Sequence, residues 1–253
     1  MTDVDQTQGP HIVPLGADGM LVRFSTQLDD AANRAVLSYA AYLDGNMPAG
    51  VVEMSTTLSS VYVRFDPGLT NRAKLTTQLN SFLQMKDWLS LPEEASKRHW
   101  HIPVVFGGEH GPQLAETAGM LGMTEEQAVK DLTSNSVRVL AIGFAPGQPY
   151  LGMLPERWDI PRLQQINPKV PAGALVVAVR QLIVFANASP TGWRQIGRSA
   201  FKPYREGATD PFPLLPGDNL WFHAVSEDEF DRIKSANADG TGGARLEMGE
   251  LVL

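Results

Sequence analysis

Hydrophobic and polar positions recur with two different periods along the first part of the chain, which predicts both strands and helices. Residues 19–24 (GMLVRF) have the length of a short strand, and residues 28–45 carry apolar side chains at helical spacing. Residues 51–66 contain two alternating runs around a Ser/Thr turn, and residues 70–89 repeat the helical spacing. The order strand, helix, strand, strand, helix, with a possible closing strand, predicts a small α+β sandwich of the ferredoxin-like kind.

Polar segments delimit this sandwich. We expect residues 1–14 to be a disordered N-terminus, because their sequence is mostly polar and acidic. The polar, proline-containing stretch SLPEEASKR (residues 90–98) marks a domain boundary, so the first domain is expected to span residues 15–95. A second domain is expected over residues 96–232, followed by a tail of residues 233–253.

The second domain is dominated by short apolar runs separated by proline and glycine. Its first strand covers residues 99–106, two short helices follow within residues 111–132, and another strand covers residues 136–144. Thr124, with Gln127 three residues later, forms a capping-box pattern at the start of the second helix. Because the remaining short strands alternate with Pro/Gly turns, we predict a closed or partly closed β-barrel.

The end of the chain changes character again. SEDEFDRI (residues 226–233) is expected to form a short acidic helix, and a Gly-rich spacer leads from it to a strand-like end. An apolar strand at a terminus commonly pairs with another strand, within the chain or on a partner.

Composition and charge narrow the class of protein. The 253 residues are 43% hydrophobic and 19% charged, with 21 Lys and Arg against 28 Asp and Glu and no basic block, so no nucleic-acid partner is expected. The longest apolar runs have strand length and fall far short of the roughly 20 residues of a membrane span. The N-terminal sequence is not a secretory signal, so we expect a cytoplasmic protein. The absence of cysteine excludes disulfides and thiol catalysis.

One loop combines rigidity with candidate chemistry. GFAPGQPYLGMLPERWDIPRL (residues 143–163) holds four prolines and three glycines, too many for a core strand or helix. We expect its backbone to be shaped into a fixed, irregular path, whose amides can bind an anion, by a set of small and cyclic residues: Gly143, Pro146, Gly147 and Gly152.

The same loop carries three candidate substrate-binding side chains, Tyr150, Arg157 and Arg162. A guanidinium is a planar fork that can hold a carboxylate or a phosphate with two parallel hydrogen bonds. The equally weighted alternative is that either arginine pairs with Glu156 or Asp159 and only fixes the loop. We predict that the loop forms the rigid rim of a ligand site.

Four further residues are candidates for substrate binding. Trp193 can form one side of a ligand site, although a place in the core is favoured. Arg198 lies two residues after Ile196, so strict alternation would put both on one strand face and leave a buried arginine in need of a partner. Gln181 and Ser189 can bind a substrate amide or satisfy local backbone.

Several kinds of site are not indicated. The sequence contains no nucleophile motif, P-loop or dinucleotide fingerprint, so this chain alone shows no recognisable ATP site. His99 and His101 share a strand face, but two ligands do not make a metal site, and a structural role is favoured. No metal is therefore expected.

The order of several unusual segments resembles one family. They are HIPVVFGGEHGPQL (101–114), IGFAPGQPYLGMLPERWDIPRL (142–163), VPAG (170–173), SPTGWRQIGR (189–198) and LLPGDNLWF (214–222). The series resembles the family of allophanate hydrolase subunit 1, KipI-like proteins and the B-type subunit of 5-oxoprolinase, whose module also occurs in the carboxyltransferase domain of urea carboxylase. The resemblance implies a ferredoxin-like N-terminal domain, a cyclophilin-like β-barrel and a sister subunit of barrel fold.

The sequence departs from the family pattern at four places. Gln148 stands where a second aromatic residue is common, Thr191 replaces a glycine, and Thr133 stands where a histidine often follows leucine. Val179 and Arg180 lie in a segment that usually contains glycines. These departures leave the fold expectation intact and bear on the choice of substrate.

The resemblance implies three alternative functions. The favoured one is a subunit of an ATP-dependent enzyme that opens a small amide or lactam, 5-oxoproline to glutamate, with ATP used by the complex. A close variant is a carboxyltransferase subunit that uses carboxybiotin from another polypeptide. The third is a regulatory protein that inhibits a histidine kinase and catalyses nothing.

Overall fold

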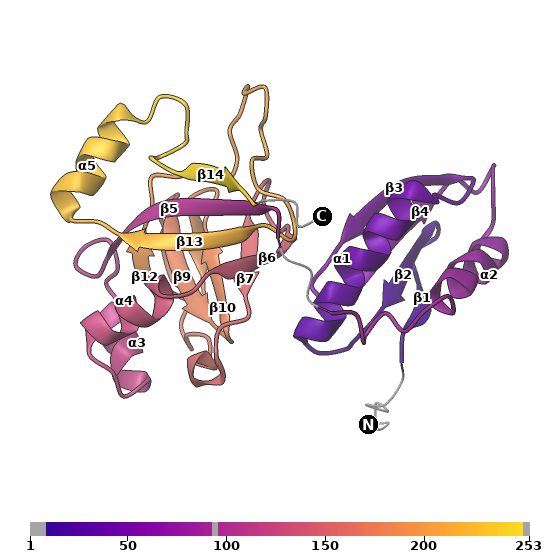
Figure 1. Ribbon diagram of the computed structural model, residues 1–253, viewed down its shortest axis with the longest axis horizontal. Coiled ribbons are helices and arrows are strands. Elements are labelled where there is room, and N and C mark those ends of the chain that lie inside the picture. The colour runs from indigo at the N-terminus through magenta and orange to yellow at the C-terminus, as the bar shows by residue number, and fades with distance from the viewer. Residues whose placement is uncertain (1–8, 93–95, 250–253) are drawn as a thin grey trace. The chain divides into compact units, whose positions relative to one another are not determined.

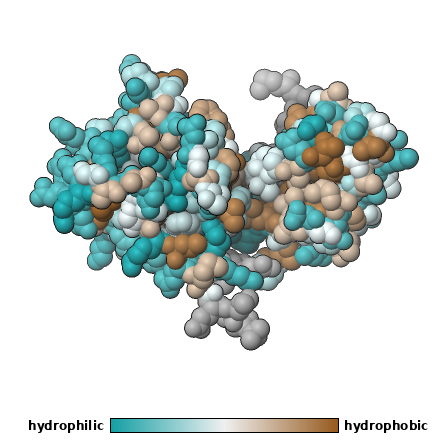
Figure 2. All heavy atoms as spheres, turned by 90° about the horizontal axis from the view of Figure 1, so that it is seen from above, coloured by the Kyte–Doolittle hydropathy of each residue, from teal (hydrophilic) through white to brown (hydrophobic). Residues whose placement is uncertain are grey.

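The computed structural model describes residues 9–92 and 96–249 of the chain. The chain divides into two compact units, residues 1–94 and residues 95–253 (Figure 1). On the face shown in Figure 2, apolar side chains are scattered among hydrophilic ones in both units. No helix in the described ranges is long and apolar enough to cross a membrane.

The first unit is a four-stranded antiparallel sheet covered by two helices. The sheet order is β1-β2-β4-β3. The elements are β1 (His11–Leu15), β2 (Gly19–Arg23), α1 (Asp30–Gly45), β3 (Val51–Thr56), β4 (Ser60–Phe65) and α2 (Arg72–Leu83). Asp29 and Asn71 accept hydrogen bonds from the first turns of α1 and α2, which explains where each helix begins. The buried core lies between the helices and the sheet, and the Tyr39 hydroxyl donates to the carbonyl of Leu79.

The edge strand β1 is a departure from the sequence prediction. We expected residues 1–14 to be disordered, but residues 11–15 pair with β2 along their whole length, so that prediction is wrong from His11 onward. Ile12 packs against the core of this unit, and the guanidinium of Arg72 binds the carbonyls of Gly16, Ala17 and Gly19 in the turn that follows. The fourth strand of this sheet thus precedes the first helix, whereas the sequence pattern allowed for a closing strand after the second helix. Residues 1–8 lie outside the described residues, and the ferredoxin-like assignment stays a prediction.

In the described part of the second unit, seven strands close into a mixed β-barrel. The barrel closes because β12 pairs with β9 on one side and with the end of β5 on the other. Its strands are β5 (Arg98–Phe106), β6 (Val137–Ile142), β7 (Pro149–Gly152), β9 (Ala174–Ala178), β10 (Gln181–Val184), β12 (Arg194–Arg198) and β13 (Asn219–Ala224). The pair β5–β13 is parallel, and the other pairs are antiparallel. The predicted barrel is confirmed, whereas its cyclophilin-like type stays a prediction.

Helices and short strands complete this unit. The helices α3 (Leu114–Met120) and α4 (Glu125–Thr133) contribute buried side chains to the barrel core, and α4 begins with the predicted capping box of Thr124 and Gln127. The strands β8 (Asn167–Val170) and β11 (Ser189–Thr191) form a separate two-stranded sheet. The helix α5 (Glu227–Ala236) runs three residues past its predicted end, and β14 (Arg245–Met248) pairs with β5 (Figure 1). The terminal strand thus finds its partner within the chain.

Asp218 is a buried charge that joins three parts of the barrel. Its side chain is 3% exposed and accepts hydrogen bonds from Arg98 Nε at 2.8 Å, Trp100 Nε1 at 3.0 Å and the backbone amide of Leu215 at 3.0 Å. Arg98 also donates to the carbonyl of Pro213 at 2.6 Å. A buried carboxylate is tolerated here because the Arg98 cation and two neutral donors are paired with it.

Asp218→Ala is expected to lower the free energy of unfolding by roughly 3 kcal/mol, because it leaves the donors of Arg98 and Trp100 without an acceptor. Chemical denaturation checks this, with the exposed Glu206→Ala as the matched control. A loss of under about 1 kcal/mol would show that Asp218 does not hold the barrel together.

Candidate functional site

A second apolar cluster lies on the outer face of the barrel. Along β9, Leu175 and Val177 belong to the barrel interior, whereas the alternate residues Ala174, Val176 and Ala178 belong to this outer cluster. Its other members are Val170, Ile183, Phe185 and Trp193. Since Val170 lies on β8 and Trp193 closely follows β11, the small two-stranded sheet packs on the outside of the barrel.

Three predicted residues meet at the edge of this cluster. The rings of Tyr150, on β7, and Trp193 lie edge to face with centroids 6.3 Å apart. The guanidinium carbon of Arg162 lies 5.6 Å from the Trp193 ring centroid. Burial raises the pKa of Tyr150, and the positive charge of Arg162 acts in the opposite direction. Trp193 is 6% exposed, so the core role favoured by the sequence is confirmed, while its ring also contacts the arginine.

Gln181 lies on the same face and is the most unusual of the candidates. It is 4% exposed, and its side-chain amide nitrogen has no hydrogen-bond partner among the residues that the structure describes. Its strand neighbour Ile183 belongs to the outer cluster and pairs with Tyr150, so alternation directs Gln181 to that face. A buried amide without a partner costs about 1–3 kcal/mol, which points to a water or ligand acceptor. We call Tyr150, Arg162, Gln181 and Trp193 the rim cluster.

Arg162 is the cation of the rim cluster that is free to bind a ligand. Its side chain is exposed, and in the part of the chain that the structure describes no carboxylate pairs with it. Ser189 lies on β11, on the small sheet next to the cluster, and its hydroxyl makes a long contact of 3.4 Å with the neighbouring carbonyl of Pro190. The structure therefore brings four of the predicted residues to one face, with Ser189 on the adjacent sheet.

Arg157 has a different role. It lies in the short helix η1 (Glu156–Trp158), and its guanidinium forms a two-pronged ion pair with Asp131 of α4. Trp158 Nε1 donates to the same carboxylate at 2.7 Å. These hydrogen bonds, that from Arg157 first, lower the pKa of Asp131. Arg157 thus fixes the loop, as the structural alternative predicted, but its partner comes from an earlier helix and is neither Glu156 nor Asp159.

The loop backbone is shaped by two of its glycines. Gly147 has φ +71° and a Cβ there would overlap the carbonyl oxygen of Pro203, so only glycine fits. A Cβ at Gly152 would lie 3.1 Å from Leu140 Cδ1 and 3.2 Å from the carbonyl oxygen of Arg180. Gly143 has open space around it, and Pro146 is exposed, so neither is required by packing.

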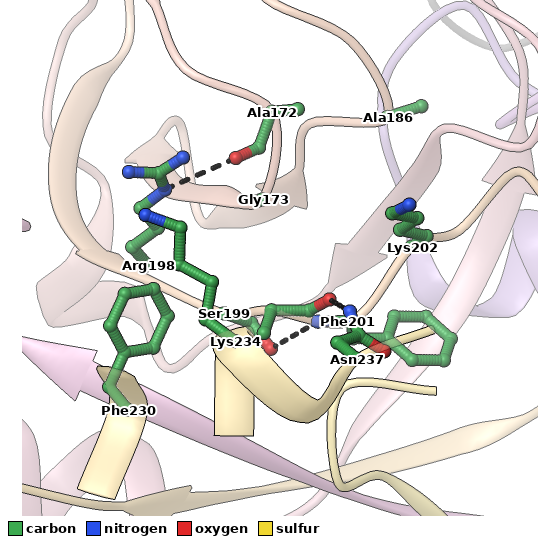
Figure 3. Close-up of a pocket in the computed structure, with 11 residues that line it drawn as sticks. Ala172, Gly173, Ala186, Arg198, Ser199, Phe201, Lys202, Phe230, Lys234 and Asn237 are labelled. Carbon is green, nitrogen blue, oxygen red and sulfur yellow. Dashed lines mark hydrogen bonds between the residues drawn. The ribbon is translucent and has the colours of Figure 1, made fainter. Parts of the chain in front are cut away.

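Arg198 does not join the rim cluster. The register between β12 and β9 shifts between Gln195 and Gly197, so Arg198 pairs with Ala174, which belongs to the outer cluster. The prediction that alternation places Arg198 on the face of Ile196 is therefore wrong, because a bulge inserts one residue and reverses the facing. Arg198 lines a separate pocket (Figure 3), and burial lowers its pKa.

The departures from the family pattern have local structural accounts. Val179 and Arg180 form the turn between β9 and β10 with φ of +45° and +62°, values that favour glycine. The turn is held by residues 143–163, which we call the opening loop: Val179 N donates to Ile160 O, Arg180 N to Trp158 O, and Arg180 Nε to Leu154 O. These bonds offset the backbone strain of a turn without glycine.

At the other three departures from the family pattern, hydrogen bonds within the protein also hold the residue. Thr191 Oγ1 accepts from the amide of Trp193 at 3.1 Å and so supports the chain that carries the rim tryptophan. Thr133 Oγ1 donates to the carbonyl of Val129 within α4. Gln148 is buried, and its backbone N–H donates to the carbonyl of Ala145, which closes a turn.

The histidines of β5 have protein neighbours. His101 Nδ1 lies 2.8 Å from His223 Nε2, and His101 Nε2 lies 3.2 Å from a carboxylate oxygen of Glu247 on β14. Burial, His101 and Arg245 lower the pKa of His223. Among residues 9–92 and 96–249 there is no group of three or more side chains arranged to hold a metal ion.

Asp131→Ala is expected to lower the free energy of unfolding by about 2 kcal/mol, because Trp158 Nε1 and Arg157 lose their acceptor. The folded state lowers the pKa of Asp131 below its ordinary value of 3.8. The stabilisation by the ionised carboxylate is therefore complete at neutral pH, and it is lost as the pH falls below 3.8 and through the lowered pKa. Hydrogen exchange at the amides of Val179 and Arg180 should accelerate, since both bond to the loop that Asp131 anchors. Glu156→Ala, the partner considered from the sequence, should change neither measurement.

Comparisons with known proteins identify the family of this chain. A family model described as carboxyltransferase domain, subdomain C and D, matches residues 10–214. The B-type subunit of 5-oxoprolinase from Bacillus subtilis (strain 168) is 30% identical over 230 residues, 88% of this chain and 96% of that protein. The B-type subunit of 5-oxoprolinase from Escherichia coli O157:H7 is 35% identical over 163 residues, 62% of this chain and 75% of that protein.

Solved structures share the fold. The crystal structure of TTHA0988 matches 82% of this chain with a TM-score of 0.69 and 31% identity, and this chain spans 40% of that longer chain. The Kluyveromyces lactis urea amidolyase matches 97% of this chain, and 17% of its own, with a TM-score of 0.74 and 17% identity, a likeness of fold alone. The chain therefore belongs to the carboxyltransferase subdomain C and D family and is a relative of the proteins named as the B-type subunit of 5-oxoprolinase.

Proposed function

We propose that this chain is the B-type subunit of an ATP-dependent 5-oxoprolinase, which opens 5-oxoproline to glutamate together with a sister subunit of barrel fold. The observation that carries the proposal is the match to the corresponding 5-oxoprolinase subunit of Bacillus subtilis over nearly the whole of both chains. The ATP is used by the complex, because the sequence holds no recognisable phosphate-binding loop. The cytoplasmic location stays a prediction from the N-terminal sequence.

The rim cluster suits the substrate class. A small lactam acid offers a flat ring, an amide and a carboxylate. Arg162 can hold the carboxylate with its planar fork, and the Trp193 ring can cover the flat face of the lactam. The unpartnered amide nitrogen of Gln181 can donate to the lactam oxygen, with the Tyr150 hydroxyl as a second polar group. In this proposal these contacts bind and orient the substrate.

The opening loop also offers a contact for that partner. Phe144 lies in this loop, is 79% exposed and has φ +70°, a conformation in which a bulky residue is strained. An exposed aromatic side chain held in a strained backbone suits a contact that forms on assembly. We assign Phe144 to the interface with the sister subunit.

Purification of the tagged chain from its own host, with mass spectrometry of what accompanies it, tests the proposal. We expect a stoichiometric barrel-type sister subunit, and a complex that hydrolyses ATP faster when 5-oxoproline is present. An activity abolished by avidin would instead identify the biotin-dependent carboxyltransferase variant. Recovery of a histidine kinase, without lactam-stimulated ATP hydrolysis, would identify the regulatory alternative.

Arg162→Gln is expected to raise the KM for 5-oxoproline roughly 10- to 100-fold with little change in kcat, because it removes a charge-assisted contact to the bound carboxylate. Steady-state kinetics of the complex check this. Lys169→Gln, an exposed cation on the neighbouring strand β8, is the control and should leave KM unchanged. An unaltered KM in Arg162→Gln would remove the rim cluster as the substrate site.

A further inference from the structure

We propose that the chain binds a small oxyanion in a second site, the Arg198 pocket, which lies between the end of β12 and the helix α5. The pocket has a volume of about 210 Å³ (Figure 3). It is lined by Arg198, Lys202, Lys234, Phe230 and Asn237 together with small residues that include Ala172. The rim cluster contributes no residue to it, so this site goes beyond the proposed function.

The charge of the pocket is one-sided. Three of its lining residues, Arg198, Lys202 and Lys234, are cations, and no aspartate or glutamate is among them. Arg198 is half-buried and uses its Nε to donate to the carbonyl of Ala172 at 3.3 Å. Within the described ranges it forms no ion pair, so its terminal nitrogens have no anionic partner. A partly buried cation without a counter-charge is costly, and an anion in the pocket would remove that cost.

Phe230 brings two of these cations together. The guanidinium carbon of Arg198 and the ammonium nitrogen of Lys234 each lie 6.0 Å from the centroid of the same Phe230 ring, which is almost fully buried. Figure 3 shows both charged groups on the same side of the pocket, beyond the ring. The ring attracts each cation, but the two cations repel one another. An oxyanion placed between them satisfies both.

The walls of the pocket are fixed by protein contacts. Asn237 Nδ2 donates to the carbonyl of Ala200 at 2.6 Å, and Asn237 Oδ1 accepts from the amide of Gly242 at 2.7 Å. The Ser199 hydroxyl accepts from the amide of Phe201 and keeps its own proton to donate. Gly173 approaches Ser199 so closely that a Cβ there would overlap the Ser199 carbonyl. The site is therefore built in advance of any ligand.

The size of the pocket sets the ligand class. Its volume of about 210 Å³ is below the range of about 300–1,000 Å³ typical of drug-sized ligands, so it suits phosphate or the carboxylate of a small acid and excludes a nucleotide. Both sources present the same chemistry, an oxyanion with several acceptor oxygens for the guanidinium and the ammonium group.

Isothermal titration of the full chain with inorganic phosphate, and separately with glutamate, tests the proposal at constant ionic strength set with chloride. We expect saturable binding of one of them, which identifies the source of the oxyanion. Lys234→Gln should weaken that binding roughly tenfold or more, because it removes one charge-assisted contact. Lys169→Gln, which lies outside the pocket, should bind like the wild type. Neither measurement requires the sister subunit or lactam-opening activity.

Thermal unfolding separates ligand binding from a structural role of Lys234. Without added oxyanion, Lys234→Gln should have a higher Tm than the wild type, because it removes a repelling charge beside Arg198. With saturating oxyanion the order should reverse, since only the wild type gains the full stabilisation of the bound state. The proposal would be overturned if phosphate and glutamate each raised the Tm of Lys234→Gln as much as that of the wild type. It would also be overturned if neither oxyanion showed saturable binding.

Discussion

The carboxylate of Asp131 is the contact on which the functional face of the barrel depends. It holds Arg157 and Trp158 against α4 and so fixes the middle of the opening loop. From that fixed segment, backbone carbonyls bind the turn of Val179 and Arg180, which joins β9 to β10. One paired charge on a neighbouring helix thus holds the turn from which β10 begins with Gln181, and a pair held in this way contributes order as well as stability.

Local sequence patterns predicted the helices and strands well, but they did not reveal contacts between residues that are distant in the sequence. The helix α4 and the barrel could be predicted because their signals come from neighbouring residues. These signals are the capping box of Thr124 and Gln127 and the succession of short strands and turns. Strand β1 was missed because residues 11–15 become ordered through pairing with β2 and through Arg72, which is distant in sequence. The partner of Arg157 was missed for the same reason, as Asp131 lies 26 residues away.

The candidate site shows where alternation fails. A single bulge in β12 carried Arg198 away from the face predicted for it, and Gly197 inside the strand is the kind of residue that can mark such a bulge. The unpartnered amide of Gln181 also emerges only from the packed structure, although the residue type was noticed in the sequence. We therefore propose two separate binding sites on one barrel: the rim cluster for a flat lactam acid and the Arg198 pocket for a small oxyanion.

We propose above all that this chain acts as part of a lactam-opening enzyme. The most direct test follows ¹³C-labelled 5-oxoproline by NMR in the presence of ATP and the purified complex of this chain with its sister subunit. We expect labelled glutamate, formed in step with the phosphate released from ATP. Persistence of the labelled lactam in the presence of the intact complex, whether or not ATP is hydrolysed, would rule out the proposed activity.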